Sequence, residues 1–286
     1  MLMEYAKRIC VVNLLCLISV TAVAESKDLT LTIHPYKSSS TLNKSFSPLA
    51  SYLSKACKCN VSLDISKDYQ SHISKAGQDQ LDIAYMGPAS YVKLVNQYGN
   101  KRILSRLQIK GSATFSGYII ASSKSQIKNI EDLKGKRFAF GSRASTMSHL
   151  VPRFMLLQSG LDMKKDFSKY EFLGSHDNVA LSVLTGNYDA GAVKEGVFHK
   201  YQKRGLLAVA KTPELSEHLF VVSNKLPSEQ YEIIRAAMLN MHATSRGMHA
   251  MHTIKKTMTR MVPAADSDYD NLREILEKLQ ANNVKY

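Results

Sequence analysis

Hydroxyl side chains gather at one expected helix start, in a pattern that can bind an anion. A strand is predicted to end at Gly141, and Ser145 and Thr146 then open a helix. Free backbone N–H groups, hydroxyl donors and the helix dipole all favour negative charge at such a point. Taken alone, however, a Ser or Thr at a helix start is more often a simple N-cap.

Further polar residues follow the ends of other expected strands. Tyr36 and Tyr85 each end a strand, and Gly174–Asp177 lies at a strand-to-helix junction. Lys194 and Glu195 follow another strand and could meet a charged substituent of a ligand, although solvation of a helix face explains them equally well. Ligands of open α/β sheets bind at such strand ends, so these residues are candidates for a cleft.

Soft metal ligands are concentrated in the segment 238–261. Met and His suit copper, and His249 and His252 are spaced to share one face of a helix. The spacing is otherwise irregular, so a methionine-rich packing face with exposed histidines is the favoured interpretation. The segment contains these residues: Met238, Met241, His242, Met248, His249, Met251, His252, Met258 and Met261.

Cys57 and Cys59 leave three possibilities open. The pair could close a disulfide, bind a soft metal or stay reduced. The spacing of a four-cysteine zinc site is absent. A packing residue followed by a loop thiol is the favoured interpretation.

Motifs of common enzymes do not occur. The chain has no H-E-x-x-H, G-x-S-x-G or Walker sequence, so we expect no enzymatic activity and no metal or organic cofactor.

Alternating strands and helices must position these residues. Hydrophobic periodicity predicts helices over 89–98, 146–158 and 178–184, and a mostly helical chain from Pro227. The helices after residue 227 are expected to have no strands of their own. The predicted strands are Leu29–Ile33, Val61–Ile65, Leu81–Met86, Tyr118–Ala121, Arg137–Phe140, Tyr170–Leu173, Tyr188–Val193, Leu206–Ala210 and Leu219–Val222.

This alternation favours an α/β protein with two sheets, hence two lobes. Lobe 1 is expected to be discontinuous, from residues 25–120 plus 218–286, and lobe 2 to comprise 121–217. A chain that leaves lobe 1, builds lobe 2 and returns would have two adjacent crossover segments. The cleft between the lobes is then the expected ligand site.

The N-terminus indicates export. Lys7 and Arg8 precede the apolar run Ile9–Val20, and Ala22–Ala24 supplies small residues for cleavage, so residues 1–24 are predicted to be a signal peptide. Cleavage removes one acidic and two basic residues, which lowers the formal charge from +14 to +13. An exported protein seldom meets nucleic acid. We therefore expect a periplasmic protein whose excess of positive charge has a role other than binding nucleic acid.

Several segments, in this order, resemble one known family. They are 34–37 (HPYK), 46–53 (FSPLASYL), 81–91 (LDIAYMGPASY), 129–136 (NIEDLKGK), 144–153 (ASTMSHLVPR), 174–177 (GSHD) and 189–193 (DAGAV). Together they resemble the PhnD-like periplasmic substrate-binding proteins of phosphonate, phosphate and phosphite ABC transporters. The resemblance covers about residues 29–240. It implies a type II periplasmic binding protein, an α/β fold whose two lobes close on a small oxyanion.

The resemblance also implies a set of ligand-binding residues. The family commonly has Ser-Thr-Ser at the helix start, whereas this chain has Ser145, Thr146 and Met147, and Ser148 compensates only if the first turn is displaced. The family's histidine at the anion corresponds to His176. Asp177 either caps its helix or accepts a proton from a monoprotonated phospho-group, which would discriminate against sulfate. The remaining expected ligand-binding residues are Tyr36, Tyr85, Met86 and Glu195.

The expected function is therefore that of a solute-binding protein of an ABC importer. Its partners would be a small phospho-oxyanion and an inner-membrane permease, and it would act as a monomer. The sequence leaves open a sensor subunit that presents its ligand to a membrane receptor kinase, and, as a weaker alternative, a Met/His-rich copper-binding protein.

Overall fold

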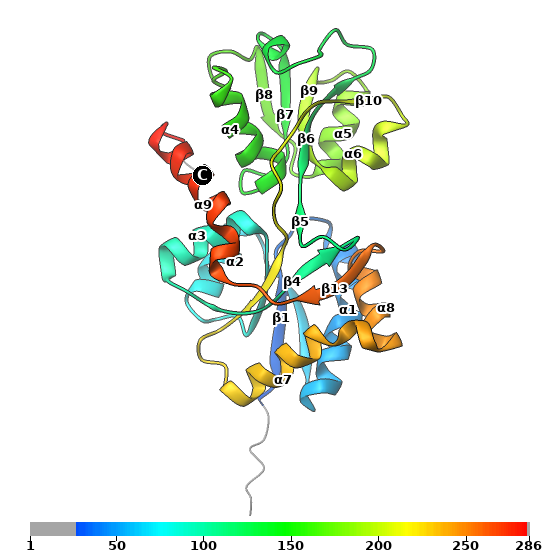
Figure 1. The fold of residues 1–286 in the computed structure, drawn as a ribbon, viewed down its shortest axis with the longest axis vertical. Coiled ribbons are helices and arrows are strands. Elements are labelled where there is room, and N and C mark those ends of the chain that lie inside the picture. The colour runs from blue at the N-terminus through cyan, green and yellow to red at the C-terminus, as the bar shows by residue number, and fades with distance from the viewer. Residues whose placement is uncertain (1–26, 285–286) are drawn as a thin grey trace, which may run out of the picture.

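Two sheets organise the chain, in a computed structural model that describes residues 27–284 (Figure 1). The predicted signal peptide, 1–24, lies outside the described residues. Within the described range, no helix is both long and apolar enough to span a membrane.

The first sheet has six strands in the order β13-β4-β12-β3-β1-β2. β1, β2 and β3 are parallel, whereas β12, β4 and β13 continue the sheet with antiparallel pairings. The strand bounds are β1 Leu29–Ile33, β2 Val61–Ile65, β3 Ile83–Met86, β4 Arg102–Ile109, β12 Leu219–Val222 and β13 Met258–Val262.

Helices cover both faces of this sheet. α1 (Ser39–Cys57), α7 (Ser228–Leu239) and α8 (Ser245–Ile254) contribute to one apolar core. On the opposite face lie α2 (Tyr69–Gly77), α3 (Pro88–Tyr98) and α9 (Asp270–Ala281), which contribute to a second core.

The second sheet has five strands in the order β10-β6-β9-β7-β8. β7, β8 and β9 are parallel, and β6 pairs antiparallel with both β9 and β10. The bounds are β6 Gly117–Ser122, β7 Arg137–Phe140, β8 Lys169–Phe172, β9 Ala190–Lys194 and β10 Leu206–Lys211. Its helices are α4 (Val151–Gln158), α5 (His176–Leu184) and α6 (Glu195–Gln202), and a short 3₁₀ turn precedes β7 at Glu131–Leu133. The lobe boundary expected after residue 120 falls inside β6. Since all of β6 belongs to the second sheet, that sheet begins at Gly117.

Two crossover segments join the sheets. β5 (Thr114–Phe115) carries the chain into the second sheet and β11 (Leu215–Ser216) carries it back, and the two pair antiparallel with each other. Figure 1 shows this small ribbon between the lobes. The expectation of two adjacent crossover segments is confirmed, and a two-stranded connection of this kind is a typical hinge.

The C-terminal helix links the lobes at another point. α9 follows the 3₁₀ turn Asp266–Tyr269 and contacts α3 of the first lobe and α4 of the second. Apolar side chains from both sides, including Leu150, Val151 and Leu272, share one buried cluster.

The C-terminal region corrects one prediction. The chain after residue 227 was expected to lack strands, but β13 pairs with β4 at the edge of the first sheet. β4, α2 and α6 were not predicted either. β13 contains Thr259 and Arg260 between methionines, so its strand character comes from pairing with a distant segment more than from local pattern.

The two cysteines also correct the sequence interpretation. Cys57 and Cys59 form a disulfide at the end of α1, with Lys58 between them in the left-handed conformation at φ 52°. The favoured interpretation of a packing residue and a loop thiol is wrong, and the disulfide alternative is correct.

Candidate functional site

Two adjoining cavities lie between the lobes. The larger has a volume of about 580 Å³ and the smaller about 30 Å³. Because five residues line both, the small pocket is the inner end of the larger cavity. The shared residues are Tyr36, Phe115, His176, Lys194 and His218.

Ser145 and Thr146 supply hydroxyl hydrogens to the small pocket, which they line. Ser145 Oγ caps the helix by accepting a hydrogen bond from the Ser148 N–H at 3.2 Å. Thr146 Oγ1 accepts from the N–H of Ala89, in the first lobe, at 3.2 Å. Each oxygen therefore accepts a hydrogen bond and keeps its own hydrogen for a ligand. The N-cap and the anion site are thus compatible functions of one segment.

The helix predicted over 146–158 begins with one turn of π-helix, Thr146–Leu150, before α4. Met147 lines the small pocket, and its Sδ accepts a hydrogen bond from Thr212 at 3.4 Å. Ser148 is buried and lines neither cavity. Its hydroxyl lies against Gly141, where any Cβ would come within 2.2 Å of Oγ. Ser148 therefore does not supply the donor that Met147 lacks, although the first turn is displaced.

His176 presents a fixed tautomer to both cavities. Its Nδ1 accepts a hydrogen bond from the Lys194 backbone N–H at 3.0 Å. Burial, followed by the charges of Lys194 and His218, lowers the pKa of His176 well below its usual value. A neutral imidazole whose Nδ1 accepts must carry its hydrogen on Nε2. His176 is therefore a hydrogen-bond donor at the cleft.

Lys194 adds positive charge at the same place. It lines both cavities, and its Nζ lies 5.5 Å from the centre of the Tyr36 ring. Burial and repulsion from Lys37 and Lys255 lower its pKa to about 8. The ammonium group is thus poorly solvated, and the repulsion from Lys37 and Lys255 is only partly offset by Glu217 and Asp177, so a bound anion would be a favourable counter-charge.

Asp177 and Glu195 line only the larger cavity. The Asp177 carboxylate accepts hydrogen bonds from Lys200 at 2.5 Å and from the Tyr201 hydroxyl at 2.9 Å. Although burial raises the pKa of Asp177, these two hydrogen bonds lower it below its usual value. Ser175, whose Oγ accepts from the Asn178 N–H, caps α5 instead. The cap suggested for Asp177 is therefore wrong.

Tyr36 lines both cavities and Tyr85 the larger one, whereas Met86 lines neither. Met86 is fully buried in the core of the first lobe, because it is the last residue of β3 and points to the side opposite Tyr85. Burial raises the pKa of both tyrosines, so their hydroxyl groups stay protonated and can donate.

Among the cavity residues that the sequence interpretation missed are His34, Glu217 and His218. His34 directly follows β1, and His218 directly precedes β12. Glu217 is buried, and its Oε2 accepts from the His218 backbone N–H at 2.9 Å and lies 2.8 Å from His218 Nδ1. Their positions at strand ends were the available signal.

The Met/His-rich segment belongs to the core of the first lobe. Met238, Met241, Met251, Met258 and Met261 are buried there, which confirms the packing interpretation. His249 and His252 are exposed on α8. Among residues 27–284, no three or more His, Cys, Asp or Glu side chains are grouped so as to hold a metal ion.

Known proteins resemble this chain in sequence over most of its length. A family model described as "ABC transporter, phosphonate, periplasmic substrate-binding protein" matches residues 31–269. A probable ABC transporter phosphite-binding protein, PhnD1 of Prochlorococcus marinus, is 26% identical over 86% of this chain and 87% of its own length. The phosphate-import protein PhnD of Mycolicibacterium smegmatis is 25% identical over 93% of this chain and 90% of its own.

Two solved structures of ABC transporter binding proteins have a fold similar to that of this chain. The crystal structure of Prochlorococcus marinus PhnD1 in complex with methylphosphonate covers 89% of this chain and 98% of its own, with a TM-score of 0.79 and 25% identity. A binding-protein component of an ABC phosphonate transporter from Pseudomonas aeruginosa has a TM-score of 0.78 at 20% identity, covering 90% and 87%.

Proposed function

Because this chain belongs to the family of periplasmic phosphonate-binding proteins of ABC transporters, we propose that its cleft binds a small phospho-oxyanion at the end lined by Ser145, Thr146 and His176. Membership in the family confirms the resemblance in the sequence and the two-lobed α/β fold. Proteins of this family bind solutes for a membrane permease and are not enzymes.

One observation carries the proposed site. Two hydroxyl hydrogens, the His176 Nε2–H and the Lys194 ammonium group all border one pocket between the lobes. Charge-assisted hydrogen bonds are about twice as strong as neutral ones, and several of them together can give micromolar affinity, about −8 kcal/mol.

The shape of the cleft supports a ligand with a substituent. The anion would occupy the inner end, and a group attached to phosphorus would extend into the larger cavity of about 580 Å³. Phosphate, phosphite and phosphonates all offer oxygen atoms that can accept hydrogen bonds from the donors at the inner end. Tyr36, Tyr85, Asp177, Lys194 and Glu195 would then surround the substituent.

A thermal-shift titration tests the proposal. Phosphate, phosphite and methylphosphonate are compared with the purified mature protein, and a ligand at 100 times its Kd should stabilise the fold by about 2.7 kcal/mol. His176→Ala should weaken binding by about tenfold or more, since a hydrogen bond to a charged group is lost. His252→Ala, on the exposed side of α8, should leave it unchanged. If none of the three anions stabilises the protein, the proposed ligand class is wrong.

We also propose that export removes residues 1–24, because the n-region, apolar run and small residues precede the described chain in the usual order. N-terminal sequencing of protein recovered from the periplasm should begin at Glu25. Recovery of the chain with Met1 intact would contradict this.

A further inference from the structure

His34 occupies an unusual place in the cleft. It is 1% exposed, directly follows β1 and lines the small pocket, opposite the donors of the second lobe. Its ring stacks on Tyr85 with 5.3 Å between centroids and on His218 with 6.0 Å. The ring is therefore held in one position by its neighbours.

The hydrogen bonds around the Tyr85 carbonyl fix the tautomer of His34. His34 Nδ1 lies 2.9 Å from this oxygen, and His72 Nε2 lies 3.1 Å from it. The Ser66 hydroxyl lies 2.8 Å from His72 Nδ1, so His72 is satisfied at both nitrogens. Because a carbonyl can only accept, His34 Nδ1 and His72 Nε2 must each carry a hydrogen.

The remaining nitrogen of His34 is left with a lone pair. Burial, followed by the charges of His72 and His218, lowers the pKa of His34 well below its usual value, so the ring is neutral. In the part of the chain that the structure describes, no hydrogen bond to His34 Nε2 is formed. The other groups bordering the small pocket from the second lobe, Ser145, Thr146, His176 and Lys194, are donors.

An acceptor that faces the donors of the second lobe has a specific consequence for an anion. A fully ionised oxyanion would place an oxygen lone pair against the nitrogen lone pair, whereas a protonated one would satisfy both atoms. Phosphate, phosphite and phosphonate monoanions carry such a P–OH hydrogen near neutral pH, and sulfate and sulfonates do not. A site that expects a hydrogen rejects an analogue that lacks it, because a buried acceptor is then left unpaired.

We propose that Nε2 of His34 accepts a hydrogen bond from a P–OH group of the bound anion and thereby selects protonated phospho-oxyanions over sulfate and sulfonates. This inference rests on the proposed function and adds to it the residue that sets specificity. It assigns this role to His34 and not to Asp177, the acceptor suggested by the sequence, because His34 lines the small pocket in which the anion is proposed to lie, whereas Asp177 lines only the larger cavity.

A pair of isosteric ligands tests the inference without altering the protein. At about pH 5.5, methylphosphonate is chiefly a monoanion with one P–OH, and methanesulfonate is a monoanion without one. Calorimetric titration should show that the unaltered protein binds methylphosphonate at least about tenfold more tightly. Equal affinities would overturn the inference while leaving the proposed function intact. Binding of neither ligand, nor of phosphate, would overturn the proposed function itself.

Variants then assign the selectivity to one atom. In His34→Asn the amide nitrogen can replace Nδ1 at the Tyr85 carbonyl, but no acceptor remains at the position of Nε2. We expect the affinity ratio of methylphosphonate to methanesulfonate to fall by about tenfold, whereas His34→Gln, which returns an oxygen near that position, should keep part of it. Asp177→Asn tests the competing assignment and should keep the ratio if His34 is the acceptor.

Circular dichroism melting establishes that each variant is folded before titration. If the ratio falls in Asp177→Asn and not in His34→Asn, the assignment to His34 is wrong. Should His34→Asn fail to fold, His34→Gln and the isosteric ligand pair still decide the question.

Discussion

At the scale of single residues, the positions of the hydrogen atoms decide which cleft groups donate hydrogen bonds and which accept them. Backbone hydrogen bonds fix His176 as a donor at Nε2 and His34 as an acceptor at Nε2. Burial lowers the pKa of both rings, so neither changes charge near neutral pH. Lys194 is the exception, since its pKa of about 8 lies within reach of ordinary buffers.

Lys194 predicts a pH dependence of anion binding. Below pH 8 the ammonium group is charged and attracts an anion, and above pH 8 it loses its proton, so affinity should fall as pH rises. A bound anion favours the charged form, so binding should raise the pKa of Lys194 and take up protons at and just above pH 8. Calorimetric titration with methylphosphonate at pH 7 and pH 9.5 measures this.

Lys194→Gln separates this effect from ionisation of the ligand. The ligand titrates identically with both proteins, so the ratio of wild-type to variant affinity isolates Lys194. We expect this ratio to decrease between pH 7 and pH 9.5. A ratio that stays constant would show that Lys194 does not change charge in this range.

At the scale of elements, strands marked by their own local pattern were predicted, whereas a strand that depends on pairing with a distant segment was missed. The expected bounds of β1, β2 and β7 agree with the structure, because alternation of apolar residues marks a strand from within. β13 was missed because Met258–Val262 becomes a strand through its pairing with β4, more than 140 residues earlier in the chain. The disulfide between Cys57 and Cys59 was left open, because two cysteines separated by one residue fit several chemistries.

The disulfide yields a prediction about stability. It closes a loop of only three residues, so the chain-entropy treatment gives a stabilisation of about 1.5 kcal/mol. The double variant Cys57→Ala with Cys59→Ala should therefore unfold at a temperature lower by a few °C. Anion affinity should be unchanged, since both cysteines lie at the far end of α1 from the cleft residues Ser38 and Thr41.

Differential scanning calorimetry with and without a reductant provides the control. The reductant should lower the unfolding temperature of the wild-type protein and have no effect on the double variant. An unfolding temperature of the wild type that is insensitive to reduction would contradict a stabilising role.

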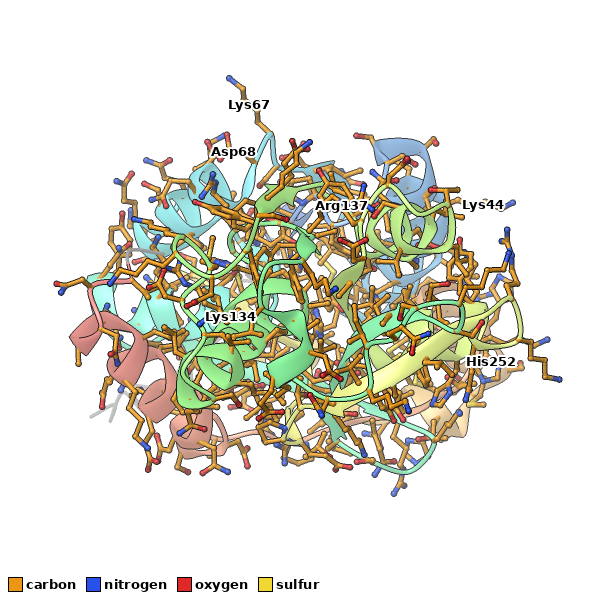
Figure 2. All side chains as sticks on the ribbon, turned by 90° about the horizontal axis from the view of Figure 1, so that it is seen from above. Lys44, Lys67, Asp68, Lys134, Arg137 and His252 are labelled. Atoms are coloured by element: carbon orange, nitrogen blue, oxygen red, sulfur yellow. A yellow bond between two sulfur atoms is a disulfide. The ribbon has the colours of Figure 1, made fainter. Side chains whose placement is uncertain are left out.

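At the scale of the whole molecule, positive charge is unevenly distributed. No Asp or Glu occurs between Asp28 and Asp64 or between Glu232 and Asp266. These stretches include α1 and α8, which pack side by side, and Figure 2 shows Lys44 and His252 on the same side of the molecule. Thr41 of α1 and Lys255, just after α8, border the larger cavity, so this basic surface begins at the cleft mouth.

This asymmetry predicts that association with an anion depends on salt. The Debye length shortens from about 30 Å at 10 mM to about 8 Å at 150 mM ionic strength, so steering by surface charge weakens. In stopped-flow measurements, Lys44→Ser with Lys256→Ser should reduce the salt dependence of the methylphosphonate association rate. The matched pair Lys124→Ser with Lys164→Ser, also exposed but in the second lobe, should reduce it less. Equal effects of the two pairs would exclude a role for the α1/α8 surface.

The sequence by itself determined the family, the two-lobed architecture and the strand ends at which Tyr36, Ser145, Thr146 and His176 lie. These features follow from local patterns, since a strand end or a helix start is marked by its own neighbouring residues. Only the tertiary structure decided that Met86 and Ser148 face away from the cleft and that His34 and His218 face it.

Tertiary structure also decided what the cleft residues do. Lys200 and Tyr201 hold Asp177 Oδ1 at the larger cavity, and the Tyr85 carbonyl, 51 residues away, leaves the lone pair of His34 on Nε2. The physical reason is that the hydrogen-bonding role of a side chain depends on which partners satisfy its other atoms. Those partners come from distant segments, and folding alone brings them within hydrogen-bonding distance.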